Sequence, residues 1–289
     1  MSIKSIVAPV RGDGKGESVL SLALAIGRKF NAHIDVLHVH AKPEDMIPYG
    51  VPLTTAFKKT ILDAASNVAT QEEARLRKLF DEYCEAKDIS PVPADAETFP
   101  VDQLSISWSE QAGKQADVIR RVGRFCDLIV VPRPDIETAL GMNTLNAALF
   151  DIRKLTAVVP PQGVTDAGRH IAIAWNGSTE AARAVNWSIP LLLKAETVSI
   201  LSAPDPDNPD SSVPAVRRYL KLHGVETQLR EFRIGRHNIG EPLLTEAKGA
   251  GADMLVMGAF GSIKRRELVL GGVTEYVAEH SDLPVMMAH

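Results

Sequence analysis

Short runs of apolar residues alternate along this chain with longer stretches of helical periodicity. Residues 3–10 form an apolar run that predicts a strand, which ends in a polar turn at Arg11-Gly12-Asp13. Residues 20–30 carry an alanine- and leucine-rich helical pattern, and residues 33–40 predict a second strand. Strands that alternate with helices in this way are typical of βαβ units and of a parallel sheet covered on both faces.

The same order of elements recurs in the second part of the chain. There, a predicted strand leads through Asn176-Gly177-Ser178 into a helical pattern at residues 180–193. The matching segments of the two copies are residues 3–13 and 170–178, residues 33–40 and 197–203, residues 126–131 and 252–257, and residues 156–159 and 284–287. The repeat predicts an α/β protein with two tandem doubly wound, Rossmann-like domains.

The join between the copies is expected at residues 160–168, which are rich in turn formers and lack periodicity. The domains would then be residues 1–160 and 168–289. The first domain contains an additional segment, roughly residues 41–86. Prolines interrupt its beginning, and residues 54–87 predict one or two amphipathic helices rich in Glu, Lys and Arg. A solvated helical excursion or a partner surface is the expected role of this segment.

Composition and charge exclude several classes of function. The 289 residues are 45% hydrophobic and 24% charged, which is typical of a globular protein of about two domains. A net charge of −4 gives no attraction toward nucleic acid or an anionic membrane. No apolar run reaches the ~18–20 residues that span a bilayer, and the first residues lack a signal-peptide pattern. A cytoplasmic protein is therefore expected.

Few side chains are spaced for metal binding or covalent catalysis. Cys84 and Cys126 form no CxxC pair, so neither zinc binding nor a structural disulfide is expected. His38 and His40 share one face of a predicted strand, but no third ligand is evident. No Ser/His/Asp or Cys/His set has motif spacing. The sequence predicts no catalytic residue and no metal site.

The most informative stretch is residues 257–274, where an apolar strand runs directly into glycines. Gly258 and Gly261 come first, nine residues follow, and Gly271 and Gly272 then precede an amphipathic helix. Glycines at the carboxyl end of a strand let the backbone approach a phosphate, and the N–H groups of a following helix point at the anion. Thr274, in the first turn, can donate a further hydrogen bond or cap the helix.

Glycines at strand-to-helix turns are common, so the spacing alone is weak support for a phosphate loop. The stretch is neither a Walker loop nor a Gly-x-Gly-x-x-Gly fingerprint. Lys264, Arg265 and Arg266 could neutralise phosphates or form an ordinary surface cluster. What strengthens the hypothesis is the second glycine pair and the position at a strand's carboxyl end, where doubly wound folds bind ligands.

Gly258-x-x-Gly261, nine residues, Gly271 resembles the ATP-binding signature of the universal stress protein (UspA-like) family. The flanking residues 252–258 and 273–277, and the closing Leu283-Pro284-Val285, resemble its usual pattern too. The resemblance covers residues 168–289 and, more faintly, residues 1–160. It implies two five-stranded domains packed as an intramolecular pseudo-dimer, whose closing strands, Thr156–Val159 and Val285–Met287, pair with each other.

The resemblance also implies a set of nucleotide-binding residues in the second domain. The residues are Trp175, Asn176, Ala203, Met257, Gly258, Gly261, Gly271, Gly272, Val273 and Thr274. Two of them depart from the family's pattern, because Asn176 stands where Asp is usual and Gly272 where Ser or Thr is usual. Phosphate binding would therefore rest on backbone N–H groups.

The first copy departs much further from the pattern. Pro132-Arg133-Pro134-Asp135 stands in place of Gly-x-x-Gly, and Leu145-Asn146 is expected in place of the second glycine pair. Arg11 occupies the position of Asn176. Prolines remove N–H donors and Asp135 would repel phosphate. The first domain is therefore expected to have lost its nucleotide site and to serve as a built-in dimerisation partner.

The expected function is a stress-response protein that binds ATP or a related adenine nucleotide, with Mg²⁺ as its companion ion, and acts through an unidentified protein partner. A homodimer of whole chains is a further option. Any ATPase activity would be slow, because no general base is evident. The alternatives are a nucleotide-free interaction protein and, less favoured, an enzyme of the adenine-nucleotide α-hydrolase-like class.

Overall fold

The computed structural model describes residues 2–40, 42, 54–135, 138, 140–203, 212–233, 239–261 and 272–289. Its strands are β1 (Ser5–Val10), β2 (His33–His40), β3 (Ser105–Ala112), β4 (Leu128–Pro132), β5 (Leu155–Val159), β6 (His170–Trp175), β7 (Thr197–Ser202), β8 (Gln228–Glu231), β9 (Met254–Gly258) and β10 (Val285–Ala288). Its helices are α1 (Gly16–Phe30), α2 (Thr55–Ala86), α3 (Gln115–Val122), the 3₁₀ turn η2 (Gly123–Phe125), α4 (Met142–Asn146), the π-helical η3 (Ala147–Asp151), α5 (Thr179–Leu192), α6 (Val213–Leu222), α7 (Gly240–Gly249) and α8 (Gly272–His280).

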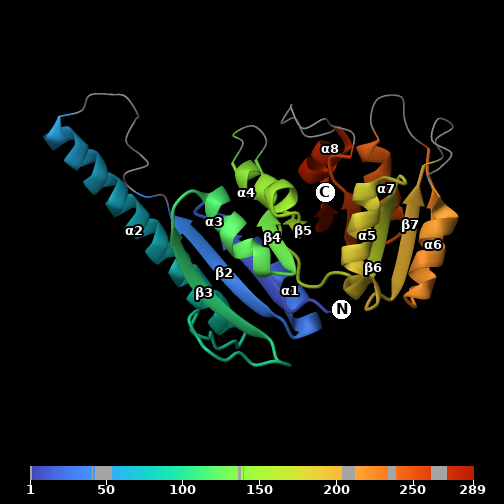
Figure 1. The fold of residues 1–289 in the computed structure, drawn as a ribbon, viewed down its shortest axis with the longest axis horizontal. Coiled ribbons are helices and arrows are strands. Elements are labelled where there is room, and N and C mark those ends of the chain that lie inside the picture. The colour runs from blue at the N-terminus through green and yellow to red at the C-terminus, as the bar shows by residue number, and fades with distance from the viewer. Residues whose placement is uncertain are drawn as a thin grey trace.

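The described strands form a single sheet across the whole molecule, in the order β3-β2-β1-β4-β5-β10-β9-β6-β7-β8 (Figure 1). Strands β1–β5, the first half, are parallel to one another, and so are β6–β10, the second half. The halves meet where β5 and β10 pair antiparallel, with Val158 opposite Val285 and Thr156 opposite Met287. The expected pseudo-dimer, with its two closing strands paired, is confirmed.

Each face of the sheet carries its own hydrophobic core. Ile6 and Ala8 pack on the face covered by α1 and α5, whereas Val7 packs on the face covered by α3, α4, α7 and α8. This division follows from the alternation of side chains along a strand. The central strands β4 and β5 are buried along their whole length, as their continuous apolar sequences predict for parallel strands covered on both faces.

The repeat also reproduces a polar contact. Asp127 precedes β4, and its carboxylate accepts from the backbone N–H groups of Lys4 (2.7 Å) and Ser5 (3.1 Å). Asp253, at the matching position before β9, accepts from the N–H groups of Gly168 (2.8 Å) and His170 (3.2 Å). In both halves the aspartate therefore ties the start of the first strand to the start of the fourth.

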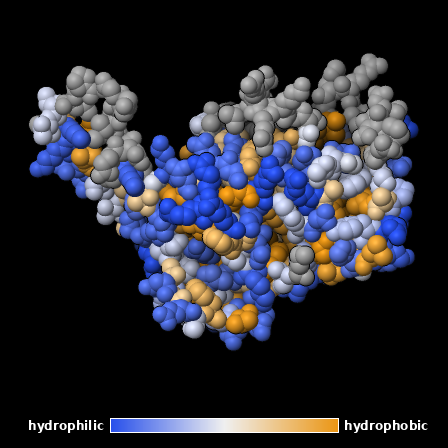
Figure 2. Space-filling view, viewed as in Figure 1, coloured by the Kyte–Doolittle hydropathy of each residue, from blue (hydrophilic) through white to orange (hydrophobic). Residues whose placement is uncertain are grey.

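The additional segment of the first half contains one helix, α2, of 32 residues. The Thr54 hydroxyl caps its start by accepting from the N–H of Phe57. Leu76, Phe80 and Cys84 are buried against the sheet, whereas the first half of the helix extends away from it with a mostly hydrophilic surface (Figures 1 and 2). The prolines expected to interrupt residues 41–53 lie outside the described residues.

The segment between β5 and β6 lies against α1. The Lys29 ammonium donates to the carbonyls of Ala167 (2.8 Å) and Gly168 (2.9 Å), and the Ser21 hydroxyl accepts from the N–H of Val164. These contacts fix the connection between the two halves. Within the described parts of the chain, no helix has both the length and the apolar character needed to cross a membrane.

Candidate functional site

The carboxyl ends of β6, β7 and β9 lie side by side at one edge of the sheet. Trp175 ends β6 opposite Ser202 of β7, and Ala174 lies opposite Met257 of β9. From β6 the chain proceeds to β7 on one side, and it returns to β9 on the other side. The gap between β6 and β9 is therefore the topological switch point, where doubly wound folds bind ligands.

Five of the predicted residues occupy this edge. Trp175 ends β6 and Asn176 follows it, Ala203 follows β7, and Met257 and Gly258 end β9. Gly261 follows three residues after β9. Gly272, Val273 and Thr274 form the first turn of α8, while Gly271 lies outside the described residues. Residues 262–270, with Lys264, Arg265 and Arg266, and the loop residue His237 also lie outside them.

Asn176 shapes the turn that leads into α5. Its side-chain oxygen accepts from the N–H of Ser178 (3.1 Å), and Gly177 between them has a φ of 74°. Ser178 then caps α5, because its hydroxyl accepts from the N–H of Ala181 (3.1 Å). The amide of Asn176 thus has a local structural role that sequence spacing did not reveal.

Gly258 and Gly261 allow the start of α5 to approach the strand end. A Cβ at Gly258 would lie 2.5 Å from the backbone nitrogen of Ala181 and 2.7 Å from the carbonyl carbon of Glu180. A Cβ at Gly261 would lie 2.9 Å from Oε2 of Glu180. Gly258 is therefore required by protein packing, and Glu180 brings an unforeseen carboxylate to the edge of the loop.

Phe260, between the two glycines, links this loop to the first half. Its φ of 63° is unusual for a bulky residue, and its N–H donates to the Thr274 hydroxyl (3.3 Å). Its ring packs 4.7 Å from the ring of Phe150, which in turn packs 4.6 Å from the ring of His289. Thr274 is buried and joins the loop to α8.

Trp175 carries an unsatisfied donor at this edge. Its indole Nε1 is buried and has no hydrogen-bond partner among the described residues. A buried N–H without an acceptor costs about 1–3 kcal/mol, so such a group calls for a partner. The prediction that Trp175 forms a wall of the site stays a prediction, but its free N–H gives this residue a chemical reason to contact a ligand.

The matching edge of the first half is filled by its own side chains. The Arg11 guanidinium pairs with Asp13 (2.8 Å), and the Lys15 ammonium donates to the carbonyl of Arg133 (2.8 Å). A Cβ at Gly141 would lie 2.8 Å from the Arg11 guanidinium. An Arg11–Asp13 ion pair and the Lys15 side chain thus occupy the edge where the second half has Asn176 and the glycine loop.

One alignment made from the sequence is wrong. Gly141, with a φ of 92°, precedes the first residue of α4 just as Gly271 precedes Gly272 at the start of α8. Gly141, not Leu145, is therefore the counterpart of Gly271. The loop before α4 is four residues shorter than the loop before α8, and this difference in length concealed the match.

Metal ligation and thiol chemistry find no support in the described residues. There, no group of three or more His, Cys, Asp or Glu side chains is arranged to hold a metal ion. His38 contacts the Val10 carbonyl (3.4 Å) and stacks on Trp108. Both cysteines are free and buried, and burial raises the pKa of Cys84 to about 11 and that of Cys126 to about 12.

Comparisons of sequence find a family match for the second half alone, whereas comparisons of structure find matches for the whole chain. A sequence model of the universal stress protein family matches residues 168–289. A search of curated proteins found no match. The structure of a universal stress protein from Archaeoglobus fulgidus is similar over 98% of this chain and 97% of its own, with a TM-score of 0.66 and 15% identity. A proposed universal stress protein from Pseudomonas aeruginosa is similar over 99% of this chain and 93% of its own, with a TM-score of 0.57 and 16% identity.

Proposed function

We propose that the second half of the chain, where residues 168–289 match the model of the universal stress protein family, binds ATP or a related adenine nucleotide. The whole chain has the fold of two such domains in tandem. The proposed role is nucleotide-responsive stress adaptation in the cytoplasm, carried out through a protein partner.

The observation that carries this proposal is the convergence of the predicted residues at the switch point between β6 and β9. Asn176 follows β6 and Gly258 ends the neighbouring strand β9 there, and α8 begins at the same edge. The start of α8 offers backbone N–H groups to an anion. The buried N–H of Trp175, which has no partner among the described residues, offers a donor to an acceptor of the base or ribose.

Glu180 affects how a phosphate group could bind here. Its carboxylate lies against Gly261 and would repel a bare triphosphate. We therefore propose that the nucleotide binds together with Mg²⁺, which would lower this repulsion. The described residues contain no group suited to hold the ion by themselves, so the phosphates would supply most of its ligands.

The same reasoning assigns a different role to the first half. At its matching edge, Arg11 and Asp13 pair with each other and Lys15 is bound to the backbone of Arg133. We propose that this half binds no nucleotide and acts as the built-in partner of the second domain. We expect any hydrolysis of a bound nucleotide to be slow, because the proposed site has no group placed to hold Mg²⁺ and an attacking water together among the described residues.

Calorimetric titration of ATP with Mg²⁺ into the full-length protein tests the proposal. Gly261→Val should abolish binding, because a β-branched side chain enters the space of the phosphates. It should still fold, since its nearest neighbour is the flexible end of Glu180. Gly272→Ser should strengthen binding by about 0.5–1.5 kcal/mol through a new hydroxyl donor, because space around Gly272 is open.

Asp135→Val, at the position matching Gly261, is the control and should leave affinity unchanged. Glu180→Gln should increase the affinity for ATP without Mg²⁺ by about 1 kcal/mol, because it removes a like charge near the phosphates. Unchanged affinity in Gly261→Val, or no binding even in Gly272→Ser, would exclude the proposed site.

A nucleotide-free interaction protein is the second candidate. It is favoured by the Asn176 oxygen, which is occupied by the N–H of Ser178, and by the Glu180 carboxylate beside the loop. This candidate predicts that no adenine nucleotide raises the thermal unfolding temperature of the protein. A ligand that binds the folded state must raise it.

A further inference from the structure

A cavity of about 600 Å³ lies on the sheet of the first half, away from the switch point of the second half. Its floor is formed by β1, β2 and β3, and the segment before β3 and the η2 turn form its walls. In the order of the sheet, β4, β5 and β10 separate it from β9 and β6. Its volume is within the range typical of small-molecule sites.

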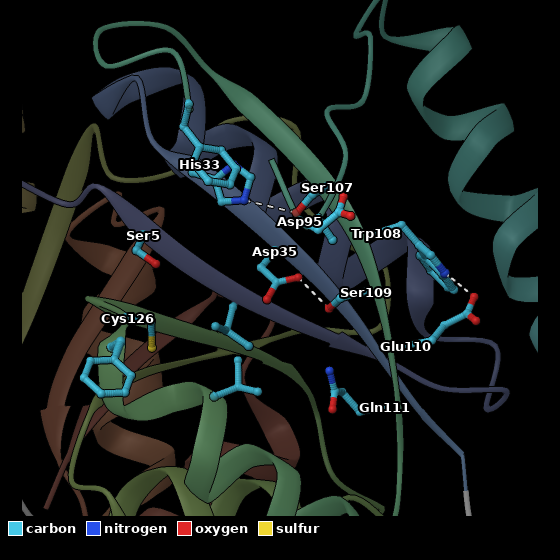
Figure 3. A pocket seen from close by; sticks show the side chains of 15 residues that line it. Ser5, His33, Asp35, Asp95, Ser107, Trp108, Ser109, Glu110, Gln111 and Cys126 are labelled. Atoms are coloured by element: carbon cyan, nitrogen blue, oxygen red, sulfur yellow. Dashed lines mark hydrogen bonds between the residues drawn. The ribbon is translucent and has the colours of Figure 1, made fainter. Parts of the chain in front are cut away.

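The floor of this cavity is polar because alternate residues of β3 are serines. Ser109 donates from its hydroxyl to Oδ1 of Asp35 (2.7 Å), and the two side chains face each other across β2 and β3 (Figure 3). His33 contacts the hydroxyls of Ser105 (2.8 Å) and Ser107 (3.1 Å). The faces of a parallel sheet are usually apolar, because helices pack on them. A row of serine hydroxyls on the outer strand β3, next to a carboxylate, is therefore unusual.

The charge at the cavity is negative. Asp35, Asp95 and Glu110 line it, and no lysine or arginine does. Asp35 makes no ion pair with any described residue, and burial raises its pKa because the ionised carboxylate loses hydration. Burial lowers the pKa of His33 and so favours its neutral form, which does not compensate this charge. An anionic ligand such as a nucleotide would be repelled, whereas a cation would satisfy Asp35.

Two exposed aromatic side chains flank the cavity. Phe125, in η2, is 88% exposed, and Phe99 is 39% exposed with its ring packed 4.6 Å from the ring of His33. Exposed phenyl groups next to a polar cavity favour a ligand with an apolar part, and aromatic faces also attract cations. Cys126 lies at the wall, but its thiol remains protonated because burial raises its pKa to about 12. A ligand here would therefore bind without a covalent bond.

We propose that this cavity, the Asp35 pocket, binds a small organic cation with a primary ammonium or guanidinium group and an apolar body. The cationic group donates charge-assisted hydrogen bonds to Asp35, and the hydroxyls of Ser107 and Ser109 accept or donate beside it. The apolar body packs against Phe99 and Phe125. Binding here is independent of the nucleotide proposed for the second half.

Titration calorimetry with 2-phenylethylamine as the probe tests the proposal on the full-length protein, with 2-phenylethanol as its uncharged analogue. The amine should bind in the millimolar range or tighter, and the alcohol at least about tenfold more weakly. Asp35→Asn should weaken amine binding about tenfold or more. Asp102→Asn removes a carboxylate that is outside the pocket and 88% exposed, and it should change nothing.

Asp35→Asn should fold at least as well as the original protein near neutral pH, because it removes a half-buried carboxylate that makes no ion pair with a described residue, while its oxygen can still accept from Ser109. Phe125→Ala, a change at an exposed side chain, is a second variant and should weaken amine binding several-fold. Equal affinity for amine and alcohol, an Asp35→Asn protein that binds the amine as well as the original, or no amine binding at millimolar concentration would each overturn the proposal. ATP titration of Asp35→Asn should match that of the original protein, which separates this result from any failure of the nucleotide site.

Discussion

At the residue scale, the two ends of the glycine stretch face different surroundings. A methyl group at Gly258 would meet the backbone of α5 at 2.5 Å, whereas a Cβ at Gly272 would have no heavy atom within 4 Å. We expect Gly258→Ala to lower the free energy of unfolding by about 1–3 kcal/mol, because the start of α5 must move. Gly272→Ala should be neutral or slightly stabilising, since alanine favours the helix.

Urea unfolding of the two variants, followed by circular dichroism, measures this difference. Similar unfolding midpoints for both would mean that α5 does not approach Gly258 closely. The comparison also separates packing from ligand binding, because neither measurement requires a nucleotide.

The cysteines give a second prediction at this scale. With pKa values raised to about 11 for Cys84 and about 12 for Cys126, almost no thiolate is present at about pH 8. We expect both to react with a thiol reagent far more slowly in the folded protein than in urea. Because folding raises both pKa values, stability should also fall as the pH rises above the unfolded value of about 8.5. Rapid modification of the folded protein would contradict their burial.

The sequence predicted which residues gather at the strand ends, but not all of their contacts. The positions of Asn176 and Gly258 follow from the strand pattern, since parallel strands share one carboxyl edge. The bond from Ser178 to Asn176 and the approach of Glu180 to Gly261 depend on the entry angle of α5. No spacing rule determines that angle. The Asp35 pocket was missed because its polar residues lie on two strands and become neighbours only through register.

At the element scale, apolar runs and their repetition predicted most strands. The strand at residues 33–40 was predicted with its observed ends. Apolar residues alternate along it without a glycine, and turn residues bound it on both sides. The outer strand β3 gave no comparable signal, since serines occupy one of its faces. The counterpart of Gly271 was misassigned because the two loops differ in length, which a comparison of spacing alone cannot detect.

One part of helix α2 packs against the sheet and the other part protrudes from it. Each part contains one phenylalanine, and the two differ in burial. Phe80 is fully buried, with its ring 5.3 Å from that of Trp108, whereas Phe57 is 55% exposed. We expect Phe80→Ala to destabilise the protein by about 3–5 kcal/mol, through lost burial and a cavity. Phe57→Ala should be neutral within about 0.5 kcal/mol. Thermal and urea unfolding measure both, and a large loss in Phe57→Ala would indicate that a partner surface covers this part of α2.

At the scale of the whole molecule, the tandem repeat and the pairing of the closing strands were predictable, because both follow from a repeated strand order and the family's usual packing. The cross-contacts that join the halves were not. Phe150 meets Phe260 and His289, and the Arg133 guanidinium donates to the Ser281 carbonyl. Arg133 and Phe260 both follow the fourth strand of their half, so the loops that end these strands also hold the two halves together.

The junction between β5 and β10 gives the last prediction, which also tests the proposed domain boundary. A fragment of residues 166–289 lacks β5 and exposes the edge of β10. We expect it to fold and to dimerise through antiparallel β10–β10 pairing, because the same edge already pairs antiparallel with β5.

The carbonyls of Pro284 and Ala288 bond to β9, so the alternation along the strand directs the N–H of Met287 toward β5. Met287→Pro should therefore convert the fragment to a monomer, whereas Met286→Pro should instead break the ladder to β9 and unfold it. Analytical ultracentrifugation measures the association, and a well-folded monomeric fragment, or a dimer that persists in Met287→Pro, would show that this edge does not drive the pairing of the two halves.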